Sequence, residues 1–183
     1  MGNLSAVENI FNFLSLELTE DAYVFFLNVK KSFNGNLELF EEFISCYLTI
    51  QKNGEVPEDL YRDFVIFFDS MLQIQDENKL LEQFARYVKY FLMLHFEYAR
   101  EIEVTQMISE INKRGLRGAY PLMMELLEDY ETALIDENSF VCLVENILDI
   151  AENKGEKDFA RFGLMINQML YNNGTSEKTR SCG

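Results

Sequence analysis

The chain contains a single histidine, His95, and this limits the chemistry that its side chains can perform. A di-metal site in a helical bundle uses two Glu-x-x-His pairs, but Leu92 stands three residues before His95. The zinc-binding His-Glu-x-x-His motif needs two histidines, and neither glycine-rich phosphate-binding motif occurs. Cys46, Cys142 and Cys182 lack the short spacings of zinc ligands. We therefore expect no enzyme activity, no metal site and no bound cofactor.

Acidic residues are concentrated in the last third of the chain. The segment Glu125–Asp158 holds eleven acidic residues and two lysines. Glu145, Asp149 and Glu152 stand at positions i, i+4 and i+7, so they share one face of a helix. Such a face is ordinarily solvated surface. The alternative interpretation is a candidate partner-binding surface, kept for a basic protein or imitating DNA.

A short basic segment interrupts this acidic chain. Lys113, Arg114 and Arg117 surround Gly115 and Gly118. Cations beside flexible glycine backbone can bind a phosphate, which makes these three residues candidate phosphate contacts. Cations in a last helical turn followed by glycine are also typical of an ordinary helix end, because they complement the helix dipole. The sequence favours the second interpretation.

Overall charge and hydropathy narrow the range of partners. The formal net charge is −15, from 31 acidic residues against 16 Lys and Arg, so the surface repels nucleic-acid backbones and anionic lipids. Broad nucleic-acid binding is therefore not expected. No apolar run approaches the roughly 20 residues of a membrane-spanning helix, and the N-terminus does not resemble a signal peptide. These features predict a cytoplasmic protein.

The elements that must position these residues are amphipathic helices, because apolar residues recur at intervals of three and four. Ser5 and Glu8 form the capping-box pattern of a first helix that ends near Glu17. Thr19 begins a second helix, which ends before Gly35. Further starts and ends follow in chain order: Asn36 to Gly54, Pro57 to about Gln75, Asp76 through a stripe ending at Tyr98, Ile102 to Gly115, a start at Tyr120-Pro121, a stripe from Phe140 to Leu148 ended by Gly155, and Phe159 to Leu170.

These patterns predict an all-α fold, a multi-helix bundle of about eight or nine amphipathic helices. We expect one helical domain over residues 1–171, with a possible division near residue 76 or 115. Residues 172–183 contain nothing to bury in a core and are expected to form a flexible tail.

Four groups of residues also resemble a known family when they are taken in order. They are Leu4-Ser5 with Asn9-Ile10-Phe11, Phe40-Glu41-Glu42-Phe43 with Tyr47-Leu48, Leu60-Tyr61-Arg62-Asp63-Phe64, and Tyr120-Pro121-Leu122 with Leu126. The order and spacing resemble the helical middle region of GmrSD-like proteins, which are modification-dependent restriction endonucleases and their relatives in phage defence. The similarity covers roughly residues 4–165, and its motifs are mostly apolar helix positions.

The resemblance implies a connecting part without active domains. Members of the family carry a ParB-like nucleotide-hydrolysing domain with an Asp-Gly-Gln-Arg-type signature, and often a His-Asn-His nuclease domain. No Asp-Gly-Gln occurs here, one histidine cannot build the nuclease motif, and only Arg161 lies near the family's arginine pair. No catalytic residue can be transferred to this chain.

Three hypotheses for the function follow. The first is a non-catalytic helical scaffold or interaction module, a segment of a larger defence-type protein that positions or regulates flanking domains. The second is a free-standing acidic inhibitor or DNA mimic that binds a DNA-binding partner. The third is a ligand-binding bundle, which needs an apolar cavity beside Tyr87, Tyr90 or His95. The sequence does not indicate an oligomeric state.

Overall fold

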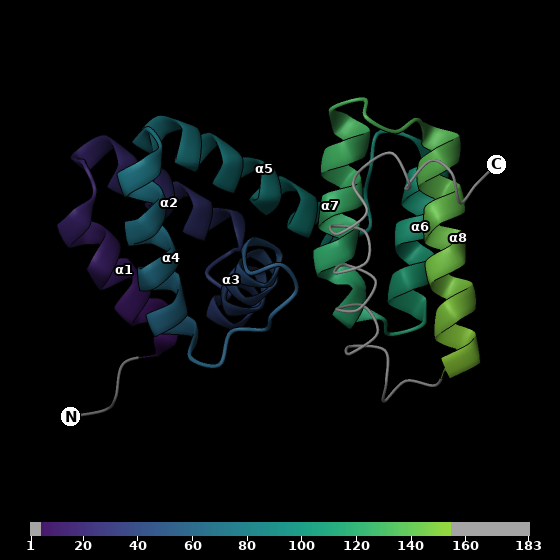
Figure 1. Cartoon of the computed structure of the whole chain (residues 1–183), viewed down its shortest axis with the longest axis horizontal. Helices are drawn as coiled ribbons and strands as arrows, with labels where there is room; N and C mark the ends of the chain where they lie inside the picture. Colours follow the sequence, from purple (N-terminus) through teal and green to yellow (C-terminus); the bar gives the residue numbers. More distant parts are fainter. Residues whose placement is uncertain (1–4, 155–183) are drawn as a thin grey trace. The chain divides into compact units, whose positions relative to one another are not determined.

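The computed structural model describes residues 5–154, and this part of the chain consists of helices and short connections (Figure 1). No strand occurs among the described residues, so the all-α prediction is confirmed. The elements are α1 (Ala6–Glu17), α2 (Glu20–Ser32), α3 (Leu37–Gln51), α4 (Leu60–Ile74), α5 (Glu77–Phe96), α6 (Ile102–Lys113), the 3₁₀ helix η1 (Arg117–Ala119), α7 (Tyr120–Glu131) and α8 (Glu137–Lys154). The helix expected over 159–170 and the tail expected over 172–183 lie outside the described residues.

The helix starts predicted from capping residues are confirmed by hydrogen bonds. The Glu8 amide donates to the Ser5 hydroxyl at 3.2 Å, and the Ser5 amide donates to the Glu8 carboxylate at 2.8 Å, which completes the capping box. The Leu39 amide likewise donates to the side-chain oxygen of Asn36 at 3.0 Å, at the start of α3. These short polar side chains satisfy amides that have no partner within the helix.

Two predicted helix boundaries are wrong. α4 begins at Leu60 rather than at Pro57, because the Asp59 carboxylate accepts from the Arg62 amide at 3.0 Å and fixes the first turn there. α5 ends at Phe96 and does not reach Tyr98, because Glu97 has a left-handed backbone with φ of 55°. The apolar stripe of α5 is buried from Leu80 to Leu94.

The described residues fall into two compact units. Residues 5–49 and 56–88 make up the N-terminal unit, and residues 50–55 and 89–154 make up the C-terminal unit. The division lies at residue 88, inside α5, whereas the sequence suggested a possible division near residue 76 or 115. Compactness does not test whether the two units unfold separately, so the single domain over 1–171 stays a prediction.

The core of the N-terminal unit is built from aromatic rings. Phe26 of α2 contacts Phe68 of α4 and Phe84 of α5, with ring centroids 5.6 Å and 4.9 Å apart. Phe43 of α3 meets Phe84 edge to face at 5.2 Å, and Tyr47 contacts the same ring at 5.1 Å. All five side chains are fully buried. Tilted and edge-to-face pairs of this kind are the favoured packing of aromatic rings, so helices α2 to α5 share one interdigitated core.

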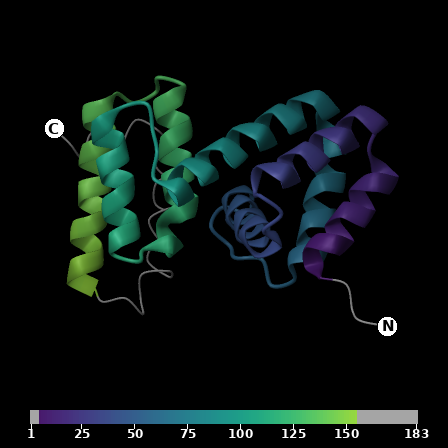
Figure 2. The ribbon, with the colours of Figure 1, turned by 180° about the vertical axis from the view of Figure 1, so that it is seen from behind.

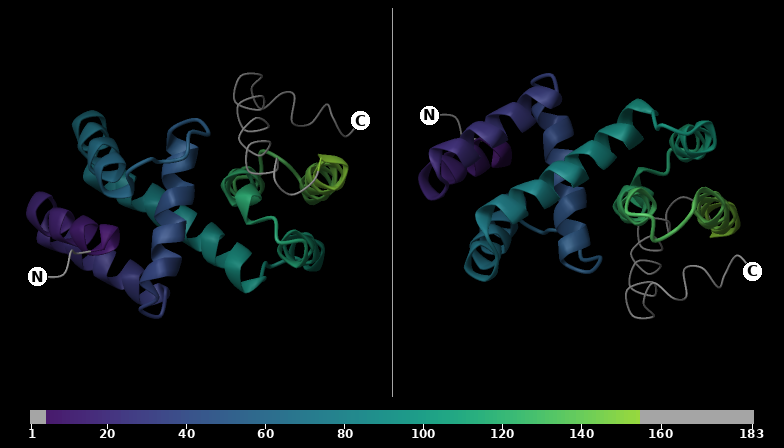
Figure 3. Two further views of the ribbon diagram at one scale, coloured as in Figure 1. Left: turned by 90° about the horizontal axis from the view of Figure 1, so that it is seen from below. Right: turned by 90° about the horizontal axis from the view of Figure 1, so that it is seen from above.

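The C-terminal unit contains an up-and-down bundle of α6, α7 and α8. Figure 1 shows the three helices side by side, with α7 running opposite to α6 and α8, and Figure 2 shows α6 and α8 next to each other from behind. Seen from above and below in Figure 3, all three helices are viewed nearly end on. The predicted stripe of α8 is buried throughout, namely Phe140, Leu143, Val144, Ile147 and Leu148. As a result, the N-terminal ends of α6 and α8 lie together at one end of the bundle.

Candidate functional site

The three candidate phosphate contacts lie at the end of α6 and in η1. The Lys113 ammonium is 2.9 Å from the Glu110 carboxylate, and Arg114 forms an ion pair with Glu152 of α8. Hydrogen bonding between Lys113 and Glu110 raises the pKa of the lysine and lowers that of the glutamate. Arg117 is exposed. The structure therefore pairs two of these cations with carboxylates of the protein itself.

The first glycine of this basic segment, Gly115, ends helix α6. Gly115 has a left-handed backbone with φ of 69°, and the Leu116 amide donates to the Ile111 carbonyl at 3.1 Å. This six-residue hydrogen bond is the mark of a Schellman motif, which ends a helix with glycine in the left-handed position. The geometry supports the helix-end interpretation, and phosphate binding at these cations stays a prediction.

The candidate acidic face lies on the outer side of α8. Glu145, Asp149 and Glu152 are exposed, opposite the buried stripe of the same helix. Arg114 neutralises one end of this row through its ion pair with Glu152. This arrangement fits solvated surface.

Three further residues named in the sequence, Cys46, Tyr87 and Tyr90, are buried in the core, whereas His95 is partly exposed. Cys46 is buried, and this burial raises the pKa of its thiol to about 12, so the reactive thiolate is suppressed at neutral pH. Tyr87 and Tyr90 are buried core residues, and His95 stacks on Phe91 with ring centroids 6.3 Å apart. None of these side chains lines the cavity described next.

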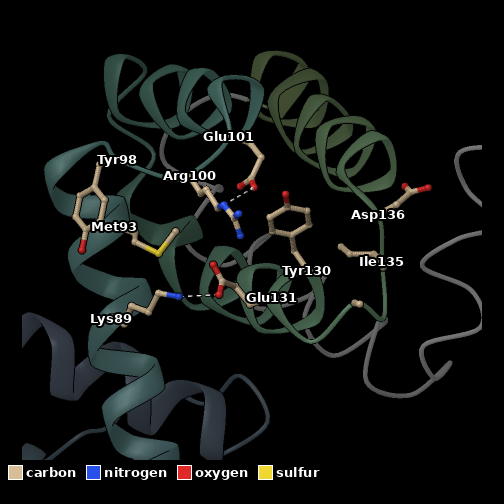
Figure 4. Close-up of a pocket in the computed structure, with 11 residues that line it drawn as sticks. Lys89, Met93, Tyr98, Arg100, Glu101, Tyr130, Glu131, Ile135 and Asp136 are labelled. Atoms are coloured by element: carbon tan, nitrogen blue, oxygen red, sulfur yellow. Dashed lines mark hydrogen bonds and ion pairs between the residues drawn. The ribbon is translucent and has the colours of Figure 1, made fainter.

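Sequence reasoning missed an open cavity of about 690 Å³ in the C-terminal unit (Figure 4). Its walls come from α5, from the connection between α5 and α6, and from the end of α7 with the connection to α8. The lining residues are Lys89, Met93, Tyr98, Ala99, Arg100, Glu101, Tyr130, Glu131, Ala133, Ile135 and Asp136. The volume lies within the range of about 300–1,000 Å³ that is usual for binding pockets.

The wall made by residues 97–101 is held in place by a network of hydrogen bonds. The Tyr98 amide donates to the Met93 carbonyl at 3.1 Å, which closes a Schellman motif around the left-handed Glu97. The Ala99 amide then donates to the Thr105 hydroxyl at 3.0 Å, which ties the connection to the first turn of α6. The side-chain amide of Asn112 donates to the Leu94 carbonyl at 2.7 Å. The cavity wall is therefore formed in advance of any binding.

The opposite wall, made by the end of α7 and the connection to α8, also contains a helix end with a left-handed residue. Ala133 has a left-handed backbone with φ of 59°, and the Leu134 amide donates to the Asp129 carbonyl at 2.8 Å. Asp136 then caps α8 by accepting from the Ser139 amide at 2.8 Å. The connection from Ala133 to Asp136 is thus fixed at both ends, so Ile135 is held in the cavity wall.

Carboxylates dominate the electrostatics of the cavity. Figure 4 shows Lys89 reaching Glu131, at 2.6 Å, and the guanidinium of Arg100 near Glu101, at 3.9 Å. Partial burial, a hydrogen bond with Glu101 and the charges of nearby carboxylates together raise the pKa of Tyr130 to about 12. A phenol becomes harder to ionise where the local potential is negative. The lining holds three carboxylates, Glu101, Glu131 and Asp136, against the two cations Lys89 and Arg100.

A second group, next to the cavity in sequence, also has a raised pKa. Glu137, the first residue of α8, has a raised pKa because of desolvation, a hydrogen bond with Glu103 and the charges of Glu103 and Glu101. Glu103 lies in the first turn of α6. The parallel course of α6 and α8 brings these acidic first turns together, and each carboxylate disfavours the charge of the other.

Another cavity, of about 560 Å³, lies in the N-terminal unit beside the starts of α2 and α5. Its polar wall serves helix capping, because the Thr19 hydroxyl donates to the Glu77 carboxylate at 2.6 Å while accepting from the Ala22 amide at 3.4 Å. The cavity in the C-terminal unit is the better candidate, since its lining includes Tyr98, a large aromatic side chain that is half exposed.

Searches for two other features gave negative results for residues 5–154. No group of three or more His, Cys, Asp and Glu side chains in this range is arranged to hold a metal ion. No helix within it combines the length and apolar character needed to cross a membrane.

Comparison of the chain with protein-family models, with curated proteins and with solved structures gave no match.

Proposed function

We propose that this chain is a non-catalytic helical interaction module, which binds a protein partner through the cavity end of its C-terminal unit. The observation that carries the proposal is the exposure of large apolar side chains on the segments that form or adjoin the cavity. Ile102 is 70% exposed, Leu134 61%, Phe96 50% and Tyr98 49%. Tyr98 lines the cavity, and Ile102 and Leu134 are sequence neighbours of lining residues. Exposed apolar side chains on the segments that form a concave surface are typical of protein interaction sites.

The resemblance to GmrSD-like proteins suggests what such a module would serve. On this proposal it positions or regulates flanking domains, or a separate partner, in a defence-type system. The hydrogen-bonded connections around the cavity support the proposal, because a surface that is already ordered loses less conformational entropy on binding.

An acidic inhibitor or DNA mimic is the second candidate function. It is favoured by the exposure of Glu145 and Asp149 on the outer face of α8. Such a protein would contact its DNA-binding partner through this face rather than through the cavity.

Site-specific photo-cross-linking tests both candidates. A photo-reactive phenylalanine analogue replaces Tyr98, Glu145 or Ile74 in separate variants, and cross-linked proteins are identified in cells that make the chain. Ile74 is the matched control, because it is 75% exposed and lies in the N-terminal unit. The proposal predicts a specific cross-linked protein from position 98 only. Cross-links from position 145 to a DNA-binding protein would favour the inhibitor, and equal yields at all three positions would contradict both.

A further inference from the structure

We infer that the cavity of the C-terminal unit binds a basic peptide segment in which lysine or arginine stands next to an apolar residue. This inference rests on the proposed function and adds the chemistry of the partner. It draws on two separate features of the cavity: its charge, and the aromatic and apolar side chains of its lining.

The charge favours a cationic occupant. Glu101, Glu131 and Asp136 line the cavity, and the charge of Glu137, at the start of α8, acts on Tyr130 of the same lining. Against these four carboxylates the cavity lining holds two cations, Lys89 and Arg100, and the Arg100 side chain is 91% exposed. A lysine or arginine that enters the cavity would relieve repulsion already present among the carboxylates. An acidic occupant would increase it.

The carboxylates are placed to receive a cation. Glu131 is one-third exposed and Glu101 somewhat less, so both remain accessible at the surface of the cavity. Both already hold a cation of the protein, at 2.6 Å and 3.9 Å respectively. Arg100 makes the longer contact and is more exposed than Lys89. An incoming guanidinium or ammonium group therefore displaces Arg100 from Glu101 with a smaller loss of free energy than it would displace Lys89 from Glu131.

The rest of the lining selects an apolar neighbour for that cation. Tyr98 lines the cavity and is half exposed, and the buried Met93 and Ile135 add apolar surface to the lining. An aromatic face attracts a cation within about 6 Å of the ring, and methionine adapts its shape to varied apolar side chains. A peptide that combines a basic and an apolar side chain therefore satisfies both parts of the cavity.

Selection from a random heptapeptide library on phage, with the purified full chain as target, tests the inference. Enriched peptides are synthesised and titrated by fluorescence anisotropy. We expect them to carry Lys or Arg next to an apolar residue, and to bind more weakly as NaCl is raised, because the attraction between the charges is screened. Enrichment of acidic or uncharged peptides, or no enrichment, would overturn the inference.

Matched variants locate the binding. Glu101→Gln combined with Glu131→Gln removes two negative charges from the cavity, and Glu145→Gln combined with Asp149→Asn removes two from the outer face of α8. The first pair should weaken peptide binding about tenfold or more, and the second less than about twofold, because close charges act more strongly than distant ones. Equal losses in both pairs would show that only overall charge matters and would overturn the inference.

Tyr98→Ser supplies a variant that leaves the carboxylates intact. Tyr98 is half exposed, so the substitution should leave the melting temperature unchanged while it weakens binding of the enriched peptides. Unchanged affinity would exclude this cavity as the site. If a specific partner cross-links at position 98 but its contacting segment is not basic, the proposed function stands and this inference fails.

Discussion

Ala133 has an unfavourable backbone conformation that the surrounding structure maintains. Its φ of 59° is left-handed, where the Cβ atom of an L-residue meets the following carbonyl oxygen. The conformation persists because it allows the Leu134 amide to reach the Asp129 carbonyl and end α7. The helix end therefore lowers the free energy more than the strain at this single residue raises it.

Replacing this alanine by glycine should stabilise the protein. Glycine adopts left-handed angles without strain, so we expect Ala133→Gly to raise the free energy of unfolding by about 1 kcal/mol. The control is Ala85→Gly in the interior of α5, which should lower it by about the same amount, because glycine costs conformational entropy in a helix. Urea unfolding measures both values. A destabilised Ala133→Gly variant would show that the left-handed geometry at this position is not maintained in solution.

Left-handed residues also mark the limit of what the sequence predicts at this scale. Ser5, Asn36 and Gly115 were predictable, because each side chain, or its absence, favours a helix end by a local mechanism. Glu97 and Ala133 favour no such conformation, and they adopt it where the Tyr98 amide reaches the Met93 carbonyl and the Leu134 amide reaches the Asp129 carbonyl. For that reason the helix predicted from the sequence continued to Tyr98, and the sequence did not indicate that Tyr98 lines a cavity.

At the scale of elements, the parallel course of α6 and α8 places two acidic first turns side by side. Desolvation, a hydrogen bond with Glu103 and the charges of Glu103 and Glu101 raise the pKa of Glu137. The favourable effect of a helix N-terminus on negative charge is here opposed by repulsion between neighbouring helices. This pair should therefore make the stability of the bundle depend on pH.

Glu137→Gln should raise the melting temperature at pH 7.5. The pKa of Glu137 is higher in the folded protein than in the unfolded chain, so folding binds a proton in the interval between the two values. Stability from this group is present below the ordinary glutamate pKa and is lost as pH rises through the raised one. Glutamine removes that loss, so its advantage over the original sequence should disappear at pH 4. Thermal unfolding followed by circular dichroism at the two pH values measures it.

Glu145→Gln provides the control for this prediction, because Glu145 lies on the same helix and is exposed. It changes the net charge by the same amount as Glu137→Gln. It should alter the pH dependence of the melting temperature less than Glu137→Gln does. The same gain in both variants would mean that overall charge, rather than contact with Glu103, controls the effect.

Helix periodicity explains why the elements were predictable and the cavity was not. The stripe from Phe140 to Leu148 repeats at helical spacing, so its buried face could be identified without a structure. The cavity takes its lining from α5 and from two helix connections that are more than 30 residues apart in sequence. No local sequence pattern indicates which connections lie close together in the folded chain. The residues that line the cavity also share no common periodicity.

At the scale of the whole molecule, the described chain has two compact units and α5 contributes residues to each. Phe43 contacts four aromatic rings of the N-terminal unit, namely Phe33, Phe40, Tyr47 and Phe84. Ile147 is buried on α8, which packs on α6 and α7 in the C-terminal unit. A cavity created at either position therefore begins in a core that belongs to one unit.

Phe43→Ala and Ile147→Ala distinguish two units that open separately from one cooperative domain. Each change should cost about 2–5 kcal/mol, through lost burial and the cavity left behind. If the units open separately, native-state hydrogen exchange should accelerate in α1 to α4 for Phe43→Ala and in α6 to α8 for Ile147→Ala, because amides report the stability of their own cooperative unit. In α5, hydrogen exchange should then accelerate before residue 88 in the Phe43→Ala variant and after residue 88 in the Ile147→Ala variant. Uniform acceleration throughout the chain in both variants would instead establish the single domain predicted over 1–171, with α5 transmitting the loss from one core to the other.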